Sequence, residues 1–312
     1  MLMNNRTLIV SLLVVLGSIL LSSCDSNKIR PARAHYSDDD VAADVKRPLS
    51  MKEAKYDKEN RFSKVQINIE YPTDDDAVSS NIRSSLLEYL HKAVLVDEEN
   101  KVIKTYGGEK SDVPEAVEYY GEKMSEALKQ RSSADHKVRQ ETIKEMAAEN
   151  GEKYDAPDVM QYYYDIEIEK EWETENYCTF DIEVESFLGG AHGSSVNLGG
   201  LTISKKDGKL FKAFLKPSSA KALQPLLRKG LIAYFVKDGM VVDDDGLNDI
   251  LQIEGNIIPL PQETPYPTEE GLVFRYGQYE IAPYAAGKPK VCVPYKEIKP
   301  FLTAEAIALL GL

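Results

Sequence analysis

Residues 162–187, YYYDIEIEKEWETENYCTFDIEVESF, decide the fold, because apolar and polar side chains alternate along two neighbouring segments. A period of two residues is typical of a strand with one buried and one solvated face. The apolar positions are Tyr164, Ile166, Ile168 and Trp172 in the first segment, and Cys178, Phe180, Ile182 and Val184 in the second. Asp181, Glu183 and Glu185 take the opposite face of the second segment. The pattern predicts two antiparallel strands whose carboxylates point to solvent.

Further strands and helices are expected on both sides of this pair. Upstream, residues 65–71 also alternate, Asp74-Asp75-Asp76 precedes a helix over 78–93, and two more helices are expected over 112–128 and 134–149. Downstream, the periodicity predicts strands at 196–203, 272–276 and 291–293, and helices over 218–235 and 297–310. The predicted fold class is α+β, an antiparallel sheet with helices packed mainly on one face.

The N-terminus has the parts of a signal peptide. A weakly basic head around Arg6 is followed by an apolar run from Leu8 to Leu21, and the run ends in Leu21-Ser22-Ser23-Cys24. The run is shorter than the roughly 20 residues that a membrane-spanning helix needs. The ending resembles the lipobox of bacterial lipoproteins, which implies removal of residues 1–23 and attachment of lipid, such as palmitate, to Cys24. We therefore expect an envelope protein held at the membrane by the lipid on Cys24, outside the cytoplasm and on the periplasmic side.

Composition divides the rest of the chain. Residues 24–60 are polar, charged and without apolar periodicity, which predicts a flexible tether. The ectodomain then comprises an N-terminal part, 61–188, and a C-terminal part, 189–312.

The chain is acidic, with a formal net charge of −13. Phosphate contacts need Lys and Arg, so we expect no nucleic-acid partner. The same charge favours encounter with a basic protein, although it also serves solubility alone.

Two cysteines accompany Cys24 in a compartment where disulfides persist. Cys178 shares the register of buried strand residues, whereas Cys292 lies between Val291 and Val293, in the opposite register to both. A disulfide and two buried free thiols both remain open, because the sequence does not give the distance between the residues.

Two stretches together resemble one family of bacterial extracytoplasmic domains. The first is Gly189-Gly190-Ala191-His192-Gly193, followed by a strand and Asp207-Gly208-Lys209-Leu210. The second runs from Phe274 to Gly287 as FRYGQYEIAPYAAG, before Val291 and Pro294-Tyr295. The combination resembles the family typified by the RsiV anti-sigma factor, the bacterial lysozyme receptor, whose domain also accompanies the catalytic domain of some peptidoglycan deacetylases.

The resemblance implies ligand binding, with a c-type lysozyme or a similar basic protein as the ligand. It places the contacts on two loops, at Gly190, His192 and Gly193 and at Pro283, Tyr284 and Gly287. Proteins of the RsiV type carry a sigma-binding segment and a transmembrane helix before this domain, where this chain has the signal and the tether. We therefore expect neither anti-sigma nor deacetylase activity.

No motif indicates a metal, a cofactor or a catalytic group. The histidines lack metal-ligand spacing, and Asp243-Asp244-Asp245-Gly246 lacks the spacing of a calcium loop. We expect binding rather than catalysis, and no cofactor. Two alternatives stay open. One is a module that binds peptidoglycan fragments or glycans through exposed tyrosines and Trp172. The other is a cell-wall hydrolase that uses His192 or a carboxylate pair such as Glu183 and Glu185.

Overall fold

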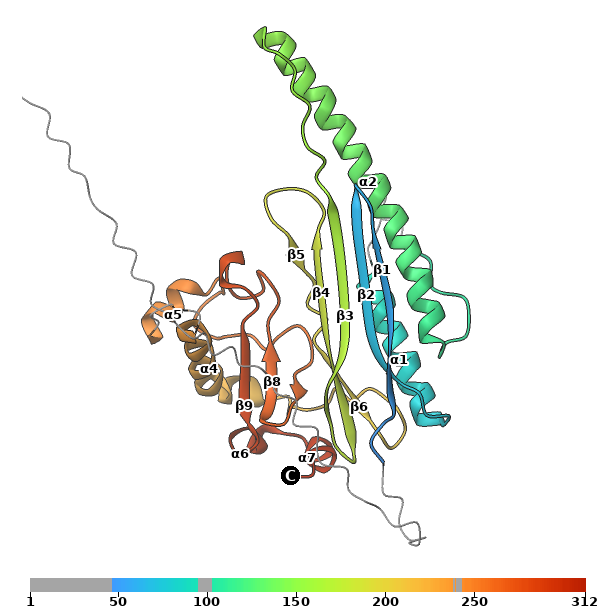
Figure 1. Ribbon diagram of the computed structural model, residues 1–312. Helices are drawn as coiled ribbons and strands as arrows, with labels where there is room; N and C mark the ends of the chain where they lie inside the picture. Colours follow the sequence, from blue (N-terminus) through green and yellow to red (C-terminus); the bar gives the residue numbers. More distant parts are fainter. Residues whose placement is uncertain (1–46, 95–102, 238, 240–242) are drawn as a thin grey trace, which may run out of the picture. The chain divides into compact units, whose positions relative to one another are not determined.

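The computed structural model describes residues 47–94, 103–237, 239 and 243–312 (Figure 1). The predicted signal peptide, Cys24 and most of the predicted tether lie outside these residues. The described residues belong to one unit that contains two hydrophobic cores. Within them, none of the helices is both long and apolar enough to cross a membrane.

The stretch 162–187 forms two antiparallel strands, β3 (Tyr162–Glu173) and β4 (Tyr177–Phe187), inside the main sheet. The sheet order is β1 (Met51–Glu59), β2 (Ser63–Pro72), β3, β4 and β5 (Ser194–Ser195), and β6 (Gly200–Ser204) also pairs with β4. The β2–β3 pair is parallel, because the chain crosses over through two helices between these strands. The other described pairs are antiparallel, which confirms the predicted α+β class.

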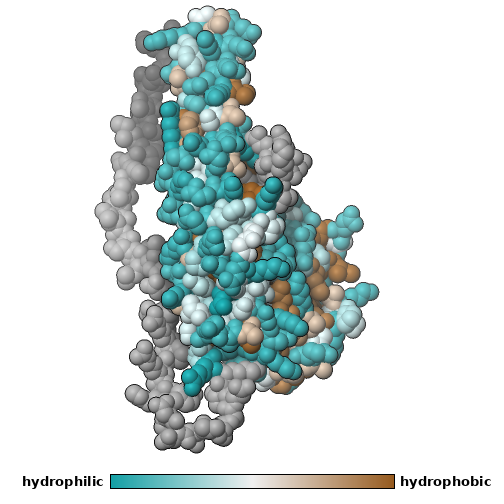
Figure 2. Space-filling model, turned by 90° about the vertical axis from the view of Figure 1, so that its right-hand side faces the viewer, coloured by the Kyte–Doolittle hydropathy of each residue, from teal (hydrophilic) through white to brown (hydrophobic). Residues whose placement is uncertain are grey.

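Helices α1 (Ala77–Ala93) and α2 (Val113–Asn150) cover one face of the main sheet (Figure 1). The apolar faces of β2, β3 and β4 meet them in the first core, which includes Ile67, Ile166, Ile182, Leu86, Tyr120 and Met124. Asp76 and Asp112 cap the two helices through their side chains. The outer side of this helix layer is mostly hydrophilic (Figure 2).

Helix α2 is one helix of 38 residues, whereas we expected two shorter ones. No proline lies between Pro114 in its first turn and Gly151, its left-handed C-cap with φ 68°. Gly121 does not break the helix, since Tyr56 packs where its side chain would be. The polar second half of the helix continues beyond the sheet (Figure 1).

The tether prediction is wrong for Met51–Glu59, which form the edge strand β1 paired with β2. Of these nine residues only Ala54 and Tyr56 are buried. The other positions are largely charged, as is common where an edge strand faces water. A strand that buries only two side chains resembles a polar linker in sequence.

A second sheet contains β7 (Tyr266–Pro267), β8 (Gly271–Arg275) and β9 (Lys290–Pro294), all antiparallel. Its core includes residues of α4 (Gln224–Lys237), α5 (Asp244–Ile250), α6 (Tyr295–Ile298) and α7 (Ala304–Leu310). The short helix α3 (Ser219–Ala222) precedes α4. Pro225 lies in the first turn of α4, so the predicted 218–235 helix is divided at Leu223. Leu210 packs on the first core and Phe211 on the second, later in the chain than the expected division at 188–189.

Both described cysteines are free thiols, buried in Cys178 and exposed in Cys292. Cys292 alternates along β9 with the buried Val291 and Val293, which turns its thiol away from the second core. The expectation of two buried thiols is therefore wrong for Cys292, and the disulfide alternative is not observed.

Candidate functional site

The two loops expected to bind ligand meet. The first loop, residues 188–193, joins β4 to β5, and the second loop, residues 276–289, joins β8 to β9. The imidazole of His192 stacks on the ring of Tyr284, with centroids 3.9 Å apart and planes at 26°. Tyr279 adds a third ring, whose centroid lies 5.8 Å from that of Tyr284. We call His192, Tyr279 and Tyr284 the aromatic surface; His192 and Tyr279 are exposed and Tyr284 is half-buried.

Glycines shape the first loop around His192. Gly189 and Gly190 have φ of 90° and 94°, which L side chains rarely adopt. A Cβ on Gly189 would lie 2.4 Å from the Tyr162 hydroxyl, and one on Gly193 2.8 Å from the Ser186 carbonyl oxygen. Nδ1 of His192 donates to the carbonyl oxygen of Gly193 at 2.8 Å, because a carbonyl only accepts. This hydrogen bond orients the ring, and in the neutral imidazole Nε2 is then the acceptor.

A short turn presents Tyr284 from the second loop. Pro283 precedes the 3₁₀ turn η1 (Tyr284–Ala286), and its carbonyl accepts from the amide of Ala286 at 2.9 Å. Gly287, with φ 69°, donates from its amide to the carbonyl of Tyr284 at 3.0 Å. Pro283 and Gly287 therefore contribute the turn, and Tyr284 contributes the contact surface.

Tyr279 holds an unusual backbone conformation. Its φ of 62° is the only positive value for a non-glycine residue in the described parts of the chain. The neighbouring carboxylate of Glu280 fixes the turn by accepting from the amides of Gly277 and Gln262, each at 2.6 Å. Conformations of this kind are costly and cluster at binding and catalytic sites. The side chain so placed is 58% exposed.

Polar side chains connect the second loop and the end of β8 to residues that follow the first loop. Gln278 accepts from the amide of Ser195 at 3.0 Å, and Nζ of Lys288 donates to the Ser195 hydroxyl at 3.2 Å. Asn197 donates to the carbonyl of Arg275 at 3.2 Å. These contacts fix the aromatic surface in one arrangement.

The expectation that the carboxylates of β4 face solvent is wrong for Asp181, whose side chain is 19% exposed. Glu183 is half-buried, and Glu185 is exposed as expected. Arg275, 5% exposed, donates from Nη1 to Asp181 at 2.5 Å and to Glu183 at 2.9 Å. Burial alone would lower the pKa of Arg275, but the two carboxylates raise it above its ordinary value. Arg275 of the second sheet thus pairs with two carboxylates, Asp181 and Glu183, that alternation alone assigned to water.

Lys288 completes this ion-pair network from the second loop. It pairs with Glu183, and its Nζ lies 3.7 Å from a carboxylate oxygen of Glu185. Both oxygens of Glu183 are therefore engaged, one by Arg275 and the other by Lys288. This arrangement argues against Glu183 and Glu185 as the acid and base of a hydrolase. Both carboxylates lie beside Lys288, and these contacts hold the second loop on β4.

Arg275, Lys288 and Tyr279 are site residues that were not predicted from the sequence. A signal existed for Arg275, because it is the one charge in β8, where all five residues are buried. A charge that ends an apolar strand predicts a buried ionic partner. Tyr279 and Lys288 carry no comparable signal, since their placement depends on the path of the second loop.

The other candidates do not join the aromatic surface. Trp172 is half-buried, and β3–β4 pairing puts it at the opposite end of the strands from the first loop. Asp243 accepts from the amide of Gly246 at 2.8 Å and caps α5, so the Asp-rich run starts a helix. Among the described residues, no three His, Cys, Asp or Glu side chains gather as a metal site.

One family model matches part of the chain. Residues 212–296 match the model of the family described as "protein of unknown function (DUF3298)". This range contains the second loop and β7–β9, and it ends before α7. No curated protein matches the chain.

Solved structures share the fold over most of the chain. A DUF3298 family member from Bacteroides fragilis is 19% identical, with 84% of this chain and 96% of that chain covered and a TM-score of 0.58. A DUF3298 family protein from Pseudomonas aeruginosa is 14% identical, with 84% and 98% covered and a TM-score of 0.50. At these identities the likeness shows the fold alone.

Proposed function

We propose that this chain is a lipid-anchored binding protein of the bacterial cell envelope and that its ligand contacts the aromatic surface. The stacking of His192 on Tyr284 carries the proposal, because it joins two separate loops into one exposed patch. The patch is preorganised by the glycines of the first loop and by the bonds of Gln278 and Lys288 to Ser195. Preorganised aromatic groups lose little entropy on binding and are enriched at protein interfaces.

A c-type lysozyme or a similar basic protein is the ligand that we favour. Support comes from the resemblance of both loops to the lysozyme-binding ectodomain family and from the net charge of −13. An acidic protein attracts a cationic partner over distances comparable to the Debye length, so the association rate should fall as salt is added.

A peptidoglycan fragment or another glycan is the second candidate. The observation that favours it is the 58% exposure of Tyr279 beside the stacked pair. An open ring face can pack against the C–H groups of a sugar, and Nε2 of His192 can accept from a hydroxyl.

The proposed location in the cell envelope depends on the lipobox-like stretch Leu21-Ser22-Ser23-Cys24. Incorporation of labelled palmitate in a bacterial host tests it, with Cys24→Ala as the matched variant. Label in the wild type that is lost in Cys24→Ala supports the lipid anchor, and equal label in both contradicts it.

The ligand is tested by calorimetric titration of the full chain, in a non-ionic detergent, with a c-type lysozyme at low and moderate salt. The full chain is needed, since a fragment that starts at residue 61 would lack β1. We expect saturable one-to-one binding that weakens with salt. If lysozyme gives no heat of binding at low or moderate salt and muropeptides bind saturably, the ligand is a peptidoglycan fragment and not lysozyme.

A further inference from the structure

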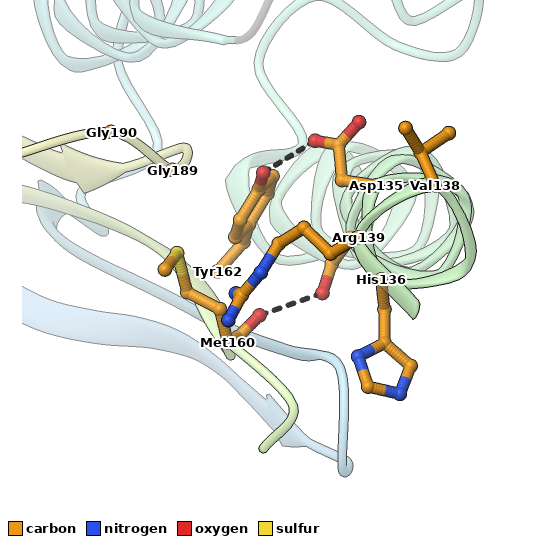
Figure 3. Close-up of a pocket in the computed structure, with 9 residues that line it drawn as sticks. Asp135, His136, Val138, Arg139, Met160, Tyr162, Gly189 and Gly190 are labelled. Atoms are coloured by element: carbon orange, nitrogen blue, oxygen red, sulfur yellow. Dashed lines mark hydrogen bonds between the residues drawn. The ribbon is translucent and has the colours of Figure 1, made fainter. Parts of the chain in front are cut away.

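Gly189 and Gly190 of the first loop also border a recess of about 280 Å³ against helix α2 (Figure 3). This volume is close to the lower end of the range for small-molecule sites, about 300 Å³. The α2 side contributes most of the side chains, and Met160 and Tyr162 complete the wall from the start of β3. The recess does not include any ring of the aromatic surface.

One wall of the recess holds a buried imidazole nitrogen without a partner. His136 is 8% exposed, and its Nδ1 makes no hydrogen bond to any described residue. The ring of Phe62 packs beside it, with centroids 6.2 Å apart. Figure 3 shows one ring nitrogen of His136 turned to the side on which Arg139 and Met160 lie. Buried polar atoms of this kind are rare without a protein, water or ligand partner.

Arg139 supplies a cation next to that nitrogen. It extends from α2 toward Met160 and Tyr162 (Figure 3). Asp135, one turn earlier, is its natural ion-pair partner, but that carboxylate accepts from the Tyr162 hydroxyl instead. In the described parts of the chain, the Arg139 guanidinium has neither an ion pair nor a hydrogen bond, so it is available to a ligand.

The charges in the recess restrict the ligand. A guanidinium binds a carboxylate through two parallel hydrogen bonds. The Asp135 carboxylate repels any anion, and because the repulsion grows with the charge of the anion, it disfavours phosphate more than a monocarboxylate. The Met160 side chain offers apolar contact, and Gly190 leaves open space where a side chain would otherwise stand.

We propose that this recess binds a small monocarboxylate with a compact apolar body, such as the free C-terminus of a short peptide. The carboxylate pairs with Arg139, a polar group of the ligand bonds to Nδ1 of His136, and the body packs on Met160. The site is separate from the proposed function, because no ring of the aromatic surface lines the recess. Tyr284→Ala should therefore leave binding in the recess unchanged.

The test compares two probes on the full chain by calorimetry: N-acetyl-alanyl-alanine and its C-terminal amide. We expect saturable binding of the acid and a loss of about tenfold or more for the amide, since a charge-assisted hydrogen bond disappears. Inorganic phosphate should bind more weakly than the acid. Equal binding of acid and amide, stronger binding of phosphate, or no saturable binding of the acid would overturn the proposal.

Variants on one helix supply the matched control. Arg139→Gln should weaken binding of the acid about tenfold or more, whereas Lys137→Gln removes an exposed charge outside the recess and should change it less than about twofold. Equal losses in both variants would mean that only the general charge of the helix matters. Thermal unfolding of each variant confirms that the fold is kept, and the comparison of acid with amide needs no variant.

Discussion

Arg275 on β8 donates a hydrogen bond of 2.5 Å to the carboxylate of Asp181 on β4. The same guanidinium reaches Glu183 and the carbonyl oxygens of Ile182 and Gly199, so one side chain of the second sheet has four partners on or beside the main sheet. The second loop follows β8 directly, and the position of Tyr284 over His192 therefore depends on this attachment.

Loss of the Arg275 charge should strongly destabilise the protein. Arg275→Met leaves Asp181 and Glu183 without their buried partner, which costs about 3–5 kcal/mol in unfolding free energy. Lys55→Met, which breaks the exposed pair with Glu53, should cost less than about 1 kcal/mol. Urea unfolding of both variants measures the difference, and similar losses in the two would refute the importance of the buried pair.

Acid should weaken the attachment of the residues before β1. Burial alone would raise the pKa of Glu173, but hydrogen bonds from Lys170, Lys205 and the Leu49 amide lower it below its ordinary value of 4.5. The stabilisation is complete above that value and is lost as the pH falls through the lower pKa of the folded state. Unfolding free energies measured from pH 7 to 3 should therefore fall more steeply for the wild type than for Glu173→Gln. Parallel curves would contradict this role.

The first loop should tolerate a side chain at Gly190 better than at Gly189. Both substitutions to alanine strain a positive φ, at a cost on the order of 1–3 kcal/mol. Gly189→Ala also sets a methyl group 2.4 Å from the Tyr162 hydroxyl, whereas Gly190→Ala meets open space. Thermal unfolding should rank Gly189→Ala as the less stable variant, and the reverse order would show that the Tyr162 contact does not shape the loop.

Thiol reactivity should separate the two described cysteines. Burial raises the pKa of Cys178 to about 12 and also raises that of the exposed Cys292. In a Cys24→Ala chain, a disulfide reagent should modify one thiol in the native protein and the second only after unfolding. A chain with no reactive thiol in either state would instead contain the disulfide.

Strong alternation made part of the fold predictable. Ile166, Ile168, Ile182 and Val184 are all buried as expected, because one face of β3 and β4 meets the helices. The parallel β2–β3 pairing was not predictable, since it depends on the crossover through α1 and α2 rather than on local pattern. Strand β1 was not predicted for a different reason: only Ala54 and Tyr56 are buried on its inner face, so its apolar pattern is weak.

The candidate site was predictable as two loops but not as one surface. Their glycines and aromatics stand out in sequence, whereas the stacking of His192 on Tyr284 follows from how the second sheet docks. That docking depends on Arg275 and Lys288 facing β4 carboxylates, and period-two alternation assigned those carboxylates to water. Local pattern gives the face of a strand, and only the tertiary fold gives what covers that face.

The most direct test of the binding surface is titration of a c-type lysozyme into three full chains: the wild type, Tyr284→Ala and Tyr154→Ala. Tyr154 is 37% exposed, lies after the end of α2 and serves as a matched loss of one surface tyrosine. We expect Tyr284→Ala to raise the Kd about tenfold or more and Tyr154→Ala to change it less than about twofold. Binding by Tyr284→Ala as tight as that of the wild type would contradict the assignment of the aromatic surface as the ligand contact.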